Sequence, residues 1–137
     1  MGRGEAGSAR TVIHLDTSFL IRSLVPRSAQ DRRLRKWLSE GASVGIGAVG
    51  WAEFLCGPVD RSHVMLAARL LGKPVSFIAE DAELTARLFN LSGRRRGTLA
   101  DCMVAATALR LDAELATANP LDFAKFEPAG LRVFGVS

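Results

Sequence analysis

The sequence predicts an α/β fold, in which a single domain carries a mainly parallel sheet of about five strands with helices on both faces. First, short apolar runs alternate with helix-like segments; these runs lie at 12–15, 44–48, 75–78, 113–116 and 132–134. Such alternation is typical of parallel strands joined by crossover helices. Second, the chain has 137 residues, of which 48% are hydrophobic. That supply is enough for one hydrophobic core and small for two.

Helix start and stop signals fill the intervals between these runs. Asp16, Thr17 and Ser18 supply helix-start residues directly after the first run. Apolar spacing and the closing glycines then predict further helices over 28–38, 50–56, 61–71, 80–91 and 98–110. We find no internal repeat and no linker-like stretch that would divide residues 11–137, and we expect residues 1–10 to form a flexible leader.

Charge and cysteine content limit the classes of function that the protein can have. The 18 basic and 14 acidic residues give a net charge of +4 and a pI of about 9.8, which favours an anionic partner. Cys56 and Cys102 stand among apolar residues, so we expect buried, reduced thiols and neither a disulfide nor a zinc site. The chain shows no apolar run long enough for a membrane span and no signal-peptide pattern. We therefore expect a cytoplasmic protein without a membrane partner.

Four acidic residues are placed where a parallel sheet gathers its ligands. Asp16 ends the first strand, Glu53 lies on the helix after the second, Asp101 opens the helix over 98–110, and Asp122 follows the fourth strand. Ligands of open parallel sheets bind outside the carboxyl ends of the strands. The four acids are therefore candidates for one site at that edge.

Each acid also has a purely structural interpretation. Asp16 is suited to cap a helix, Asp101 forms a possible capping box with Thr98, and Asp122 in a first helical turn is favoured by the helix dipole. Glu53 is harder to explain in this way, because its neighbours are apolar and an unpartnered carboxylate among them is costly.

A cluster of carboxylates requires a compensating charge. Neighbouring carboxylates raise each other's pKa unless a cation lies among them. Mg²⁺ and Mn²⁺ suit sites built of carboxylates and water, lower the pKa of a bound water, and neutralise charge on a phosphoryl group. A divalent metal site is thus the simplest explanation of four acids at one edge of the sheet.

The segments that carry these acids resemble, in order, those of the PIN-domain nucleases and more narrowly the VapC-type toxins of bacterial toxin–antitoxin pairs. They are Val-Ile-His-Leu-Asp-Thr-Ser-Phe-Leu-Ile at 12–21, Trp-Ala-Glu-Phe-Leu-Cys-Gly at 51–57, Leu-Ala-Asp-Cys-Met-Val-Ala-Ala-Thr-Ala at 99–108, and Ala-Thr-Ala-Asn-Pro-Leu-Asp-Phe at 116–123. The resemblance covers about residues 11–136. It implies a single PIN-like domain over 11–137.

The resemblance also implies an activity and a set of roles. The activity is that of an endoribonuclease that depends on Mg²⁺, with Mn²⁺ as an alternative, and hydrolyses RNA phosphodiester bonds. Asp16, Glu53 and Asp101 would hold the metal directly or through water, and Asp122 would complete or orient the site. Asn119 competes with Asp122 for that fourth position. The supporting polar residues would be Thr17, Ser18, Thr117 and Asn119.

Partners follow from the same resemblance. A toxin implies a cognate antitoxin protein, and members of the family commonly form homodimers. Residues 24–26 and the helix over 65–71 are candidate docking surfaces for such partners, with core packing as their alternative role.

Two basic segments suit an RNA substrate. Arg94, Arg95 and Arg96 precede the helix that bears Asp101, and we expect them to contact RNA phosphates. The cations at 32, 33, 35 and 36 form either a solvated helix face or a rim for a long RNA.

Other classes of protein fit less well. A haloacid-dehalogenase-like phosphatase would carry a second Asp where Ser18 stands, and a phospho-receiver domain would pair another acid with Asp16. A PIN-like RNA-processing nuclease, or an RNA-binding module that is not a toxin, remains the alternative.

Overall fold

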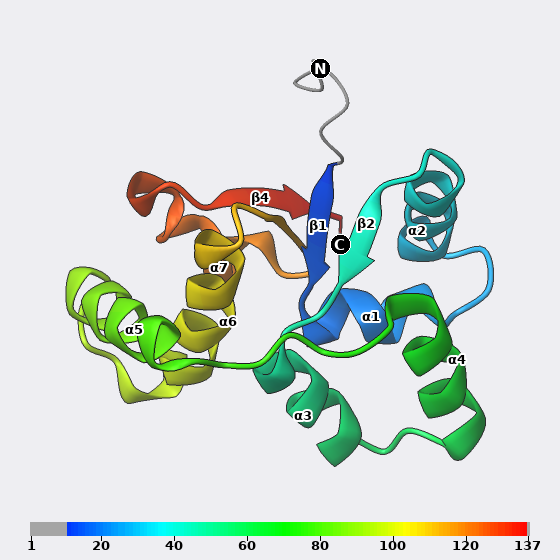
Figure 1. Ribbon diagram of the computed structural model, residues 1–137, viewed down its shortest axis with the longest axis horizontal. Coiled ribbons are helices and arrows are strands. Elements are labelled where there is room, and N and C mark those ends of the chain that lie inside the picture. The colour runs from blue at the N-terminus through cyan, green and yellow to red at the C-terminus, as the bar shows by residue number, and fades with distance from the viewer. Residues whose placement is uncertain (1–10, 137) are drawn as a thin grey trace, which may run out of the picture.

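The computed structural model describes residues 11–136 and shows an α/β fold around a parallel sheet (Figure 1). The expected leader at 1–10 lies outside the described residues. Four strands form the sheet in the order β2-β1-β3-β4, and every neighbouring pair is parallel. Their bounds are β1 Val12–Leu15, β2 Ser43–Gly45, β3 Glu114–Thr117 and β4 Arg132–Gly135. The predicted fold class is confirmed.

The expected strand at 75–78 is reduced to a single parallel bridge between Gly47 and Val75. The Val75 amide donates to the Ile46 carbonyl at 2.9 Å, and the Val75 carbonyl accepts from the Ala48 amide at 2.8 Å. Pairing ends there because the Ile78 amide donates to Asp81 Oδ2 at 3.2 Å, at the start of the next helix. The prediction of a strand over 75–78 was wrong, because the Ile78 amide bonds to the helix start and no longer donates to a neighbouring strand.

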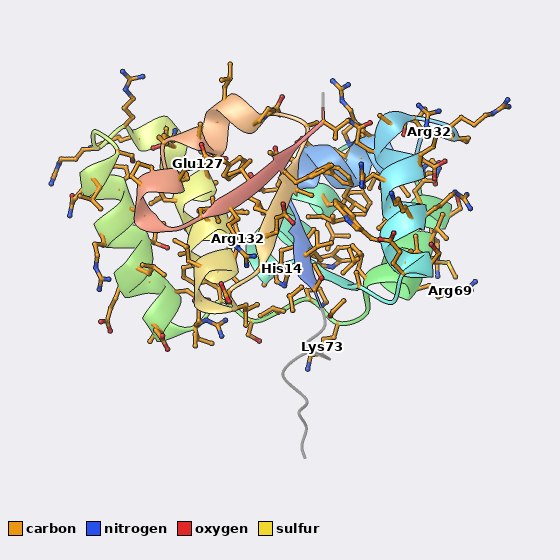
Figure 2. All side chains as sticks on the ribbon, turned by 90° about the horizontal axis from the view of Figure 1, so that it is seen from above. His14, Arg32, Arg69, Lys73, Glu127 and Arg132 are labelled. Carbon is orange, nitrogen blue, oxygen red and sulfur yellow. The ribbon has the colours of Figure 1, made fainter. Side chains whose placement is uncertain are left out.

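The helices lie on the two faces of the sheet (Figures 1 and 2). Their bounds are α1 Thr17–Ser23, α2 Ala29–Ser39, α3 Ala48–Cys56, α4 Arg61–Leu71, α5 Ala79–Leu91, α6 Leu99–Arg110 and α7 Pro120–Ala124, with short 3₁₀ helices η2 Arg96–Thr98 and η3 Glu127–Ala129. Helices α1 to α4 pack against one hydrophobic cluster and α5 to α7 against the other. Among the described residues, no helix has the length and apolar character that crossing a membrane requires.

The alternation of side chains along each strand divides the core into these two clusters. On β1, Ile13 and Leu15 belong to the cluster under α1 to α4, whereas Val12 faces the other cluster. On β3, Ala116 faces the first cluster and Leu115 the second. This period of two, with apolar residues on both faces, is the pattern of a strand buried on both sides. It fixes the register of the carboxyl ends, where the candidate site residues stand.

One of the two cysteine predictions was wrong. Cys102 is buried in the cluster under α5 to α7, as expected, but Cys56 is exposed. Helix α3 buries only Gly50 and Phe54, and Cys56 is its last residue. The apolar run over 51–56 therefore includes residues of α3 that do not face the core.

Helices α5 and α6 are joined by a buried ion pair. The Asp81 side chain is fully buried and pairs with Arg110, whose Nη2 lies 3.1 Å from Asp81 Oδ2. The Thr107 hydroxyl donates to the same oxygen at 3.0 Å. Burial raises the pKa of Asp81, but the hydrogen bonds from Arg110, Ile78 and Thr107 together hold the pKa below its ordinary value. The pair thereby fixes α6, which carries Asp101.

Replacing Arg110 with Met should lower the free energy of unfolding by about 3 kcal/mol, because the Asp81 carboxylate would remain buried without its cation. Urea unfolding at neutral pH measures the change. The matched control is Arg35→Met, because Arg35 pairs with Asp31 at 3.0 Å but is itself largely exposed. It should cost no more than about 0.5 kcal/mol. Equal losses in the two variants would contradict a structural role for the buried pair.

Candidate active site

A hollow of about 290 Å³ opens at the carboxyl ends of β1 and β3, where three of the four predicted acids meet. It is lined by Asp16, Thr17, Ser18, Ile21, Glu53, Asp101, Val104, Asn119 and Phe123. These residues come from α1, α3, α6 and the segment from the end of β3 into α7. Residues more than a hundred positions apart in the chain thus line one cavity, at the edge of the sheet that its parallel topology predicts.

Asp16 is the most buried of these acids, with 6% of its surface exposed. Its Oδ1 accepts hydrogen bonds from the Phe19 amide and the Ser18 hydroxyl, both at 2.8 Å. Its Oδ2 accepts from the Thr117 hydroxyl at 2.6 Å. Asp16 therefore caps α1, as the structural interpretation required, and also presents a fixed carboxylate to the hollow. Burial raises its pKa, the three hydrogen bonds lower it, and the charge of Asp122 raises it further, with a net increase.

Hydroxyl groups tie this carboxylate to β3. Thr117 Oγ1, besides donating to Asp16, accepts from the Asn119 amide at 2.9 Å. The Ser18 hydroxyl accepts from the Ala118 amide at 3.1 Å. The predicted supporting residues Ser18 and Thr117 thus connect the start of α1 to the segment that presents Asn119.

Glu53 reaches the hollow because α3 approaches α1 closely. The Thr17 hydroxyl donates to the Gly50 carbonyl at 2.8 Å and lies 3.4 Å from Glu53 Oε1. A Cβ atom at Gly50 would come within 3.3 Å of Ile46, so the glycine avoids crowding against the segment that leads into α3. Burial raises the pKa of Glu53, and the charge of Asp16 raises it further, despite the Thr17 hydrogen bond.

Asp101 stands in the first turn of α6, but the capping box that could explain it is absent. The Thr98 hydroxyl donates to the Arg95 carbonyl at 2.6 Å and makes no cap to the helix. Burial raises the pKa of Asp101 to about 6, with further increases from the charges of Asp122, Glu53 and Asp16 against an opposing effect of Lys125. The Asp101 carboxylate thus lies near other negative charges, and it takes no part in a capping box with Thr98.

The two candidates for the fourth position occupy different places. Asn119 lines the hollow, whereas Asp122 lies in the first turn of α7 and does not. Asp122 is nevertheless near enough for its charge to raise the pKa of both Asp16 and Asp101. Asn119 therefore forms part of the wall of the hollow, whereas Asp122 lies outside the hollow and affects its acids only through its charge.

The sequence did not single out the apolar wall or one nearby cation. Ile21, Val104 and Phe123 line the hollow beside the acids. Val104 follows Asp101 by three residues, a helical spacing that places both on one face and could have identified it. The charge of Lys125 lowers the pKa of Asp101, and only the arrangement of α7 beside α6 reveals it.

The arginine segment before α6 is exposed and close to the start of that helix. Arg94 adopts a left-handed backbone with φ of 58° and donates to Asn90 Oδ1 at 2.8 Å, and Arg96 begins η2. All three guanidinium groups at 94–96 belong to exposed residues. They are available to a ligand that approaches along α6.

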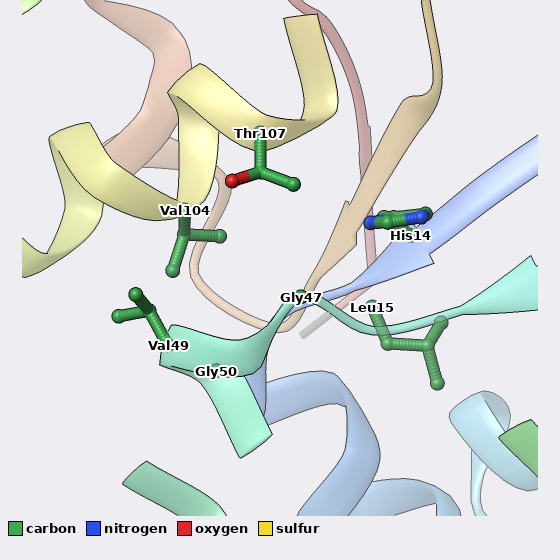
Figure 3. A pocket seen from close by; sticks show the side chains of 7 residues that line it. All are labelled: His14, Leu15, Gly47, Val49, Gly50, Val104 and Thr107. Carbon is green, nitrogen blue, oxygen red and sulfur yellow. The ribbon is translucent and has the colours of Figure 1, made fainter. Parts of the chain in front are cut away.

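A second, enclosed hollow lies behind this site (Figure 3). It has a volume of about 10 Å³ and is lined by His14, Leu15, Gly47, Val49, Gly50, Val104 and Thr107. Val104 lines both hollows, so the two are separated by one side chain. Burial, and secondarily the Arg110 charge, lowers the pKa of His14 to about 4. His14 is therefore a neutral core histidine at physiological pH.

The donor set of the larger hollow suits a hard divalent cation, since its polar lining supplies oxygen atoms from carboxylates, hydroxyls and an amide. As the side chains lie, no three acidic, imidazole or thiol groups within 11–136 converge on one ion position. Mg²⁺ is usually held by one or two carboxylates and keeps several waters, so it does not require such convergence. Burial first, and then repulsion between neighbouring carboxylates, raises the pKa values of Asp16, Glu53 and Asp101, and a bound cation would favour the charged form of each.

Comparison with known proteins identifies the family. The sequence profile of the PIN domain matches residues 13–127, and the chain belongs to this family. PIN domains are nucleases and generally use divalent metals. No protein of curated function matches the sequence significantly.

Solved structures with the same fold come from toxin–antitoxin complexes. A chain of VapBC2 from Rickettsia felis, bound to a DNA fragment from its promoter, superposes with a TM-score of 0.72 at 16% identity, over 93% of this chain and all (100%) of that one. A chain of VapBC-1 from Haemophilus influenzae superposes with a TM-score of 0.67 at 18% sequence identity, over 91% of this chain and 98% of that one. A chain of FitAcB from Neisseria gonorrhoeae superposes with a TM-score of 0.64 at 24% sequence identity, over 89% of this chain and 96% of that one. At these identities the likeness shows the shared fold.

Replacing Asp101 with Asn should stabilise the metal-free protein at pH 7.5. The folded-state pKa of Asp101, about 6, lies above its ordinary value of 3.8, so ionisation costs folding free energy once the pH exceeds that ordinary value. The cost grows from about pH 4 to about pH 6 and then stays constant. After allowance for solvent screening we expect a gain of about 1–2 kcal/mol.

Urea unfolding with a chelator at pH 4.5 and pH 7.5 measures this gain. The gain should be larger at the higher pH. The control is Asp112→Asn, because the Asp112 side chain is 97% exposed and follows the carboxyl end of α6, whereas Asp101 stands in its first turn. A variant less stable than the parent at pH 7.5 would contradict the cost that burial and like charges impose on the Asp101 carboxylate.

Proposed function

We propose that the chain is an endoribonuclease that hydrolyses RNA phosphodiester bonds with Mg²⁺ or Mn²⁺ and acts as the toxin of a toxin–antitoxin pair. One observation carries the proposal: Asp16, Glu53 and Asp101 line a single open hollow at the carboxyl edge of the sheet, and the pKa of each is raised. Membership of a nuclease family supports hydrolysis of nucleic acid. The solved toxin–antitoxin complexes with this fold support the toxin role.

Each acid has its own part in this proposal. Asp16 and Asp101 would hold the cation directly or through water, and Glu53 would complete its shell from α3. When bound, the cation would lower the pKa of a water and neutralise charge on the scissile phosphate. Asn119, which lines the hollow, would donate its side-chain amide to a phosphate oxygen. Asp122 would raise the affinity for the cation through its charge.

The protein's own groups keep this arrangement fixed before substrate arrives. The hydroxyls of Ser18 and Thr117 hold the Asp16 carboxylate, so it requires no reorientation on binding. Ile21, Val104 and Phe123 form an apolar wall that excludes bulk water from one side. The exposed cations at 94–96 would contact phosphates of the same strand outside the hollow.

With Mg²⁺, the parent protein should cleave RNA, and Asp101→Asn or Glu53→Gln should reduce the cleavage rate by about a thousandfold through loss of charge stabilisation at the reacting phosphate. Gel analysis of structured and unstructured RNA measures this. The matched control is Glu83→Gln, a change on an exposed residue of α5. A parent protein that cuts no RNA with either metal would overturn the nuclease proposal, and full activity of Asp101→Asn would overturn the site.

We place the antitoxin contact on an apolar groove that joins the two docking surfaces expected from the sequence. The groove has a volume of about 310 Å³ and lies between α1, α2 and α4. It is lined by Ser23, Leu24, Pro26, Asp31, Leu34, Arg35, Leu38, Leu66 and Leu70. Leu66 and Leu70 stand one helical turn apart on α4 and are 44% and 37% exposed. An apolar segment of a partner protein suits such a groove. The homodimer that the resemblance implies stays a prediction.

The double variant Leu66→Glu and Leu70→Glu should weaken binding of the antitoxin by about a hundredfold or more, because it places charge against apolar surface. Titration calorimetry with the purified cognate antitoxin measures the affinity. RNA cleavage without antitoxin provides the internal check that the variant folds. Unchanged antitoxin affinity in an active variant would contradict this placement.

A further inference from the structure

A second basic surface lies on α2, apart from the arginines at 94–96. It is a shallow groove of about 270 Å³ lined by Ala29, Arg32, Arg33, Lys36 and Val136, and none of these five residues is acidic. Residues 32 and 36 are four apart and 33 and 36 are three apart, so the three cations share one helix face. Like charges at these spacings repel one another. A groove with this lining favours an anion.

Two of the three cations of this basic groove, Arg32 and Arg33, are held in place by the fold. The Arg33 guanidinium lies 4.9 Å from the centre of the Phe134 ring and 5.9 Å from that of Trp37. Arg32 Nη1 donates to the Arg27 carbonyl at 2.7 Å, and Arg32 lies on the outer side of the molecule (Figure 2). These contacts restrict the side chains and lower the entropy cost of binding a ligand. The neighbouring Arg35 differs, because Asp31 neutralises it.

The basic groove adjoins the candidate active site along the carboxyl edge of the sheet. Val136, which lines the groove, donates its amide to the Thr117 carbonyl at 3.1 Å, and its own carbonyl accepts from Gln30 Nε2 at 2.6 Å. The Thr117 hydroxyl holds Asp16 in the hollow. Neighbouring strands are about 5 Å apart. A ligand that leaves the hollow across the ends of β3 and β4, where Pro120 of α7 packs on Gly135, comes to the side of the molecule on which the groove lies.

We propose that the basic groove formed by Arg32, Arg33 and Lys36 binds the phosphodiester backbone of a single-stranded RNA that passes through the active-site hollow. This inference rests on the proposed ribonuclease function and adds a second contact region to it. Its contacts are to phosphates, so they supply affinity without reading the base sequence. Long RNA would engage both the groove and the hollow, whereas a short oligonucleotide would engage the hollow alone.

The test measures RNA affinity by fluorescence anisotropy in the Asp101→Asn background, so that cleavage does not interfere. The double change Arg32→Ala and Lys36→Ala should weaken binding of a long single-stranded RNA on the order of tenfold, and it should lower the slope of log affinity against log salt by about 1.4. The ratio of long-RNA to short-oligonucleotide affinity should fall. Arg87→Ala is the matched control, because Arg87 is an exposed cation on α5 that lines neither groove, and we expect little change.

Arg33 requires a separate variant because its side chain also packs on aromatic rings. Arg33→Met removes the charge but keeps an apolar stem of similar length, and its effect on RNA affinity should add to that of the double change.

The inference is overturned by an unchanged affinity and salt slope in the double variant, or by an equal loss in Arg87→Ala. It is also overturned if an acidic polypeptide such as polyglutamate loses more affinity than RNA does, since the groove would then serve a protein partner. Its failure is distinct from failure of the ribonuclease proposal, which would appear as absence of cleavage by the parent protein. Binding of RNA in the Asp101→Asn background is measured independently of that cleavage.

Discussion

The buried carboxylate of Asp16 is the constraint on which the candidate site depends. With 6% of its surface exposed, this group requires hydrogen-bond donors, and α1, Ser18 and Thr117 supply them. The same bonds set the direction of α1 away from β1 and tie it to the end of β3. Because Thr117 also accepts from the Asn119 amide, the turn that leads into α7 is fixed by the same network. One buried charge therefore organises the three segments around the hollow.

The other acids are placed without such compensation. Asp101 and Glu53 face the hollow with raised pKa values, and the hydrogen bond that Glu53 receives from Thr17 spans 3.4 Å. The fold tolerates this repulsion because other contacts, among them the Asp81–Arg110 pair, hold α6 in place. Functional sites commonly keep residues that make the folded protein less stable than other residues at those positions would. The net positive charge of the protein then lies outside the hollow, on α2 and before α6, where it can attract a polyanion.

Much of this arrangement could be predicted from the sequence, because the strand-then-acid pattern and the apolar spacing are local signals. The helix at 61–71 was predicted with its observed bounds, and three of the four acids meet as the topology implied. The run at 75–78 failed because Asp81 takes the Ile78 amide for a helix start, a competition that strand propensity does not reveal. The capping box at Thr98 failed because its hydroxyl bonds backwards to Arg95. The relative places of Asn119 and Asp122 depend on how α7 packs, which no local pattern records.

We propose that the carboxylates of Asp16 after β1, Glu53 on α3 and Asp101 on α6 together hold a divalent cation. Anomalous diffraction from a crystal of this protein grown with Mn²⁺ tests it most directly, because it locates the ion independently of activity. We predict a peak in the hollow lined by Asp16, Glu53 and Asp101, contacting Asp16 or Asp101 directly or through water, and its loss in Asp101→Asn. An Mn²⁺ peak only at other surface carboxylates, or a peak in the hollow unaffected by Asp101→Asn, would contradict the account.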